Sequence, residues 1–129
     1  MSTPTDIITC PKCKETMRRL IVEDTYIDRC PNCFGIWADG KERIKLVAHK
    51  KLAKVIDTGD AKVGKHYDKI TEIDCPRCGD RMEHKQHPDQ KHIGFEECRR
   101  CQGRYFDAGE VRDLASVTIG EALRMMLGR

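Results

Sequence analysis

Eight cysteines occur as four Cys-x-x-Cys pairs, and they are the residues of this chain best suited to hold metal ions. Two cysteines separated by two residues can clamp one tetrahedral ion from a tight turn. The halves read C-x2-C-x16-C-x2-C and C-x2-C-x19-C-x2-C, spacings typical of four-thiolate zinc sites. Four thiolates select a soft tetrahedral ion, so we expect one ion in each half. Zinc is the expected metal for both sites, and iron is the alternative. The predicted ligands are Cys10, Cys13, Cys30 and Cys33 for the first site, and Cys75, Cys78, Cys98 and Cys101 for the second.

Two arrangements of the four pairs are open, because consecutive pairs can share an ion or the pairs can interleave between the halves. The chain repeats itself, with the first pair of each half related by 65 residues and the second pair by 68. This repeat favours consecutive sharing, in which each half is a complete unit. Disulfides are a further alternative, but the N-terminal residues resemble no secretory signal, which favours a reducing, cytoplasmic location.

Other side chains offer little further chemistry. Four cysteines per ion leave no open position for water or substrate, and the chain has no phosphate loop, nucleophile motif or paired-carboxylate motif. We therefore expect neither enzyme activity nor a small-molecule substrate. His84, His87 and His92 lie in the longer hairpin, where they either hold a weak third ion or form a solvated turn.

The second pair of each half opens a longer shared pattern. Gly35 and Gly103 each stand two residues past the last cysteine, where a positive φ would let the turn close. An aromatic residue, Trp37 or Tyr105, follows two residues later and can cover one side of its own site. We therefore expect each half to supply both the turn and the cover of its metal site.

A helix is expected to follow each turn. Asp39-x-x-Glu42 and Asp107-x-x-Glu110 place a capping acid three residues before a glutamate, as in a capping box. The apolar residues that follow recur at three- and four-residue steps, which predicts amphipathic helices over 39–57 and from about 107 onward.

These elements predict a small metal-bound α+β fold with two tandem zinc ribbons, each a β-hairpin with two cysteine turns followed by an amphipathic helix. The expected divisions are a tail at 1–9, the first ribbon and helix at 10–57, a polar linker at 58–74, and the second ribbon and helix at 75–129. Hydrophobic residues make up 39% of the chain and aromatic residues 5%, too few for two independent apolar cores. A half of about 60 residues is marginal on burial alone, so the metal is expected to be structural.

The order of these motifs resembles the transcription factor IIB-type zinc-ribbon domains of small bacterial and archaeal proteins. The resemblance covers both copies, over roughly 10–44 and 75–112, and includes the glutamate that opens each helix. The second copy has Tyr105 where the family pattern has tryptophan. The resemblance implies a zinc ribbon that serves as a binding module.

Three functional hypotheses follow. The net charge of +3 permits a nucleic-acid partner without announcing one, and Arg43, Lys50 and Lys54 form one basic stripe on the first helix that could follow phosphates or simply be solvated. The alternative is a protein-interaction or assembly adaptor, in which the amphipathic helices contact a protein or form a homodimer. A rubredoxin-like electron carrier is the third. The chain has no apolar run long enough to span a bilayer, so no membrane contact is expected.

Overall fold

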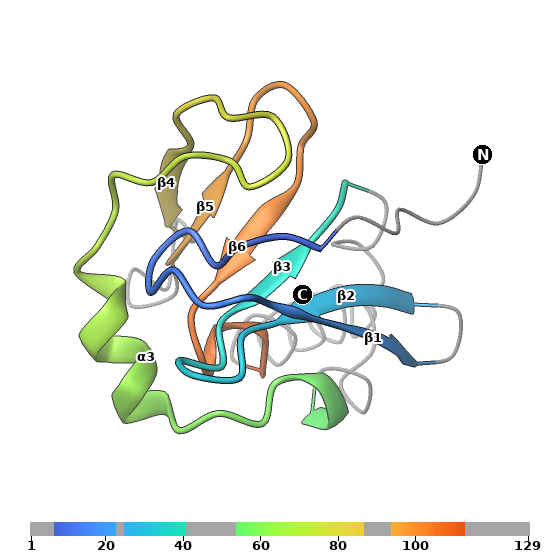
Figure 1. The fold of residues 1–129 in the computed structure, drawn as a ribbon. Coiled ribbons are helices and arrows are strands. Elements are labelled where there is room, and N and C mark those ends of the chain that lie inside the picture. The colour runs from blue at the N-terminus through green and yellow to red at the C-terminus, as the bar shows by residue number, and fades with distance from the viewer. Residues whose placement is uncertain (1–6, 23–24, 41–53, 87–93, 113–129) are drawn as a thin grey trace, which may run out of the picture.

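The computed structural model describes residues 7–22, 25–40, 54–86 and 94–112, and Figure 1 shows their arrangement. These residues form six short strands and one helix. In chain order they are β1 (Arg18–Val22), β2 (Thr25–Arg29), β3 (Ile36–Ala38), α3 (Ala61–Asp68), β4 (Glu83–Gln86), β5 (Gly94–Glu97) and β6 (Arg104–Phe106). Residues 54–56 and 110–112 are also helical, and most of the two helices expected after the ribbons lies outside the described residues.

All six strands join one antiparallel sheet in the order β1-β2-β3-β6-β5-β4 (Figure 1). The hairpins β1–β2 and β4–β5 are the ones that the sequence predicts. The third strand of each half, β3 or β6, was not predicted, because three residues are too few to show a periodic pattern. These two short strands pair with each other and join the halves.

The central pairing follows an approximate two-fold axis. Trp37 lies opposite Tyr105, and Ile36 lies opposite Phe106. Because Trp37 and Tyr105 occupy equivalent positions in the repeat, each copy presents the same strand to the other. The sheet is therefore built as a pair of related halves around the β3–β6 contact.

One buried cluster extends through both halves. Its members are equivalent residues of the two copies. They include the isoleucine two residues before the first cysteine of each half, the methionine four residues after the second cysteine, and the aromatic residue of β3 or β6. The cluster consists of Ile8, Met17, Trp37, Ile73, Met82, Tyr105 and cysteines of both sites. The halves therefore share an apolar core, which relieves the shortage of hydrophobic residues. The expected division boundaries themselves stay a prediction.

The segment expected as a linker contains α3. Asp60 caps this helix by accepting a hydrogen bond from Lys62 N at 2.8 Å. Gly64 places the helix backbone directly against the backbone of Ala108, so that no side chain would fit there. Tyr67 packs against the shared core. The sequence pattern does not predict α3, because an eight-residue helix with one glycine has almost no periodicity.

Asp57, at the end of the helical stretch 54–56, stabilises the helix start in the other half. Its carboxylate accepts hydrogen bonds from Gly109 N at 2.8 Å and Arg112 N at 3.1 Å. Burial raises the pKa of Asp57, while these donors and the nearby guanidinium oppose the rise. Glu110 accepts from Gly94 N at 3.2 Å. The capping box expected at 107–110 therefore does not include the carboxylate of Asp57, which the first half supplies to this helix start.

Candidate metal centres

The four cysteine turns have the same backbone geometry. In each turn the amide four residues after the first cysteine donates to that cysteine's carbonyl, at 2.8–3.0 Å. The residue immediately after the second cysteine has a positive φ in every case: Lys14 (69°), Phe34 (61°), Gly79 (80°) and Gln102 (63°). The prediction that Gly35 and Gly103 take the positive φ is therefore wrong, because the left-handed position is one residue earlier.

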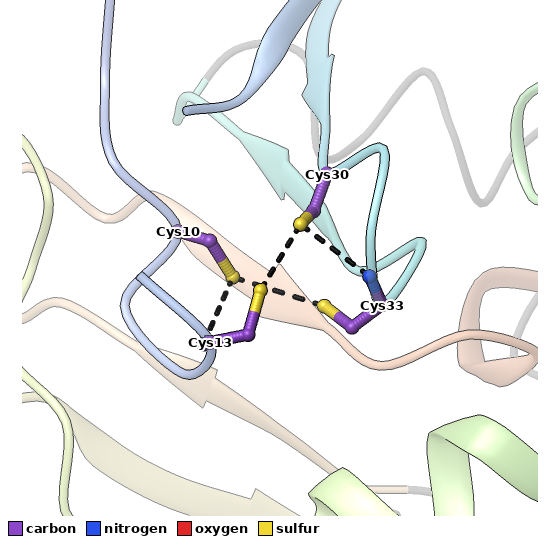
Figure 2. Close-up of side chains that lie close together, drawn as sticks. All are labelled: Cys10, Cys13, Cys30 and Cys33. Atoms are coloured by element: carbon purple, nitrogen blue, oxygen red, sulfur yellow. Dashed lines mark hydrogen bonds between the residues drawn. The ribbon is translucent and has the colours of Figure 1, made fainter. Parts of the chain in front are cut away.

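The cysteine sulfurs gather in two groups of four, one from each half, as consecutive sharing requires. Within each group all sulfurs lie within 4.8 Å of one another. Figure 2 shows the sulfurs of Cys10, Cys13, Cys30 and Cys33 converging from two turns. The Cys10–Cys33 and Cys75–Cys101 sulfurs are 3.8 Å apart. A tetrahedron whose corners lie about 2.3 Å from its centre has edges of about 3.8 Å, so the two groups fit two zinc ions.

The surroundings of the sulfurs favour a bound cation. Backbone amides point at the first sulfur of a turn, for example Cys78 N to Cys75 Sγ at 3.3 Å and Asn32 N to Cys30 Sγ at 3.4 Å. Burial raises the pKa of Cys30, Cys75 and Cys101 to about 11 each. A buried thiolate therefore needs a neighbouring positive charge, which a metal dication supplies.

The aromatic cover of the first site comes from the second half. The Tyr105 hydroxyl lies 3.3 Å from the sulfurs of both Cys10 and Cys33, and the ring is completely buried. Burial and the neighbouring sulfurs raise the pKa of Tyr105, so its hydroxyl keeps its proton. The expectation that each aromatic covers its own site is wrong here, since Tyr105 crosses to the other half.

Gly35 and Gly103 are explained by these crossing aromatics. A methyl group on Gly35 would overlap the hydroxyl and Cζ of Tyr105 and would lie 3.1 Å from Tyr105 Cε1. A methyl group on Gly103 would meet Trp37 Cη2 at 2.5 Å. Each glycine therefore makes room for the aromatic of the opposite half. The pairing of Trp37 with Tyr105 across β3–β6 positions both rings for this exchange.

Ion pairs repeat the same exchange. Lys12, in the first turn of the first half, lies 2.8 Å from Asp107 and 3.2 Å from Glu96 of the second half, with no exposed side-chain surface. Its equivalent Arg77 lies 3.2 Å from Asp39 and 3.4 Å from Asp28 of the first half. The Lys12 ammonium also donates to the Tyr67 carbonyl at 3.0 Å.

The sequence contains a signal for these ion pairs. Both first turns carry a basic residue after the proline, at positions 12 and 77, and both β2 and β5 carry an acid at equivalent positions. A matched base and acid in each copy of a repeat indicate a contact between copies as readily as one within a copy. The structure places the expected capping acids Asp39 and Asp107 in ion pairs between the halves.

The remaining predicted residues are only partly described. His84 Nδ1 lies 2.6 Å from Glu96 Oε2, while His87 and His92 lie outside the described residues. Arg43 and Lys50 also lie outside them, and Lys54 is an exposed residue of the helical stretch 54–56. Within the described segments, no helix is both long and apolar enough to cross a membrane.

Comparison with known proteins agrees with the geometry of the two sites. The profile of the family described as transcription factor zinc-finger matches residues 9–49 and 74–117, about two-thirds of the chain. Each matched region contains one complete group of four cysteines. Neither the search of curated proteins nor the search of solved structures finds a match.

Proposed function

Because the chain belongs to the transcription factor zinc-finger family, as two tandem zinc ribbons of the transcription factor IIB type, we propose that it is a non-enzymatic binding module. In this proposal the eight cysteines ligate two structural zinc ions, an amphipathic helix follows each ribbon, and the first helix contacts nucleic acid or a nucleoprotein. The observation that carries the proposal is the pair of four-sulfur groups, each of a size that fits zinc.

The composition of the two groups supports a structural role. Catalytic zinc keeps a position open for water or substrate, whereas four protein ligands close the coordination sphere. Each group offers four sulfurs from turns that share one backbone geometry. In small zinc-finger peptides near neutral pH, binding of a structural zinc ion stabilises the folded state by about 10–16 kcal/mol.

Elemental analysis of the full chain, purified under reducing conditions, tests the metal assignment. We expect two zinc ions per chain and a colourless protein. Iron with visible absorption would instead support the electron-carrier hypothesis, and fewer than two ions per chain would contradict the assignment. Chelation at neutral pH should abolish the near-ultraviolet circular dichroism of Trp37, the only tryptophan, because that ring is buried in the shared core.

The proposed nucleic-acid contact rests on the family and on the charge of the first half. Residues 1–59 hold the whole positive excess of the chain. Lys54, the first residue of the helical stretch 54–56, is exposed, so its ammonium is accessible to a phosphate. Arg43 and Lys50 complete the predicted stripe on sequence spacing.

A titration with duplex DNA and structured RNA at two salt concentrations tests this contact. Replacing Arg43, Lys50 and Lys54 by glutamine should weaken binding and reduce the salt slope by roughly 2–3, since each phosphate contact on DNA contributes about 0.9. The matched control replaces three exposed lysines of another segment, Lys62, Lys65 and Lys69, and should change the slope less. Equal effects of the two triple variants, or no binding of the unaltered chain at low salt, would contradict the contact.

One observation favours the alternative of a protein-interaction adaptor. Val55, which belongs to the predicted apolar stripe of the first helix, is 57% exposed, whereas its neighbour Ile56 is fully buried. An exposed apolar residue beside the basic stripe suits a protein contact. Light scattering after size-exclusion chromatography would distinguish a homodimer from a monomer, and Val55→Ser should shift a dimer toward the monomer.

A further inference from the structure

The two crossing aromatics differ in the hydrogen bonds that they make. The Tyr105 hydroxyl is within hydrogen-bonding distance of two sulfurs of the first site, at 3.3 Å from both. Its equivalent Trp37 has one polar hydrogen, on Nε1, and donates it to Asp39 Oδ1 at 3.0 Å. The first site therefore faces a hydroxyl from the other half, whereas the equivalent aromatic Trp37 directs its one polar hydrogen at a carboxylate of its own half.

The two sites also differ in the exposure of their last cysteine. In the first site Cys33 is 2% exposed, whereas its equivalent Cys101 in the second site is partly exposed. Four thiolates around one zinc dication carry a net charge of −2, which is costly to bury without hydrogen-bond donors. Cys101 can be solvated, but Cys33 is shielded from water and lies against the Tyr105 hydroxyl.

The direction of the hydrogen bonds follows from the chemistry of the groups. A metal-bound thiolate has no proton to give, so it can only accept. A phenol has an ordinary pKa of about 10 and is a donor near neutral pH. With zinc bound, the Tyr105 hydroxyl therefore donates a charge-assisted hydrogen bond to Cys10 Sγ or Cys33 Sγ, or shares its proton between them.

We propose that Tyr105 is an outer-shell hydrogen-bond donor to the thiolates of the first site, so that the affinity of the first site for metal depends on a residue of the second half. This inference rests on the proposed zinc ligation. Tyr105 reaches the first site from β6, four residues after Cys101, a ligand of the second site. Metal bound in the second half fixes this turn and strand, and thereby the position of the hydroxyl. Because coupling between two sites is reciprocal, metal in the first site also raises the affinity of the second.

The test compares single hydroxyl deletions in the full chain loaded with cadmium-113, with zinc affinities measured by chelator competition. Tyr105→Phe removes the hydroxyl at the sulfurs and keeps the ring. Tyr67→Phe is the matched control, because Tyr67 also packs against the shared core, and the hydroxyl hydrogen-bonded to the described sulfurs of the first site is that of Tyr105. Cadmium resonances are assigned to the sites through their couplings to cysteine β-protons.

We expect Tyr105→Phe to shift the cadmium resonance of the first site and to weaken zinc binding there by about 10–100-fold, the range for outer-shell partners of metal ligands. The resonance of the second site should move less, and Tyr67→Phe should leave both nearly unchanged. Two ions bound with unchanged affinity in Tyr105→Phe, or equal weakening by the two variants, would overturn the hydroxyl's role while leaving the zinc assignment intact. Fewer than two ions in the unaltered chain would overturn the zinc assignment and this inference with it.

Discussion

Replacing Gly35 by alanine tests whether the crossing aromatic, rather than backbone conformation, demands glycine at this position. A methyl group there would overlap the hydroxyl and Cζ of Tyr105, whose ring has no exposed surface and little room to move. Overpacking of a tight core costs about 1–3 kcal/mol. Moving the hydroxyl off two sulfurs adds about 1.5–3 kcal/mol, the contribution of a hydrogen bond to a charged group. We therefore expect Gly35→Ala to lower the free energy of unfolding by about 3–5 kcal/mol.

The assay is urea unfolding followed by the fluorescence of Trp37 at a fixed free zinc concentration, because bound metal contributes to apparent stability. Tyr105→Leu should remove most of the clash, so the double variant Gly35→Ala with Tyr105→Leu should be more stable than the sum of the single effects by about 2 kcal/mol. Gly79→Ala is the control, since φ is +80° there and nothing lies within 4 Å of the added methyl. It should cost about 1–2 kcal/mol, and Tyr105→Leu should not rescue it. Additive effects at Gly35 would refute the steric explanation.

Three further predictions concern a turn, the ion pairs and the pH dependence of zinc binding. Gln102→Gly should stabilise the chain by about 0.5–1 kcal/mol in the same assay, because relief of the left-handed backbone (φ 63°) exceeds the added chain entropy. Lys12→Met should destabilise it by about 3–5 kcal/mol by leaving Glu96 and Asp107 buried without their cation, and Arg77→Met should cost less because Arg77 is 16% exposed. Zinc affinity should fall as the pH is lowered, because the pKa of about 11 for metal-free Cys30, Cys75 and Cys101 keeps these thiols protonated near neutrality. Each proton displaced by zinc contributes up to about tenfold in affinity per pH unit. Calorimetry in two buffers of different ionisation enthalpy should detect the release of these protons.

The metal groups could be predicted because their information is local. A Cys-x-x-Cys turn needs only a few residues to form, and the two hairpins bring consecutive turns together. The spacing therefore identified which sulfurs converge. It did not identify the residue with positive φ, because only Gly79 is a glycine, and Phe34 and Gln102 adopt the conformation without this sign.

The contacts between the halves could not be predicted in the same way. A repeat shows that two units are alike, but each unit's acids, bases and aromatics satisfy a contact within the unit as well as one between units. The sequence pattern therefore predicts that Trp37 and Tyr105 cover their own sites, although β3–β6 pairing brings Tyr105 to the other site. The signal that could have shown the crossing is the glycine two residues before each aromatic, which makes room for the ring of the opposite copy.

Differences between the copies are complementary across the approximate two-fold axis. Lys12, the shorter base, pairs with Glu96, the longer acid, and Arg77, the longer base, pairs with Asp28, the shorter acid. The combined reach of base and acid is thus similar in both crossings, although neither residue type is the same. A homodimer of one ribbon would have to use one base and one acid at both crossings, and one aromatic on both sides. A fused chain can change one member of a pair and compensate in the other half, as the Lys12–Glu96 and Arg77–Asp28 pairs do.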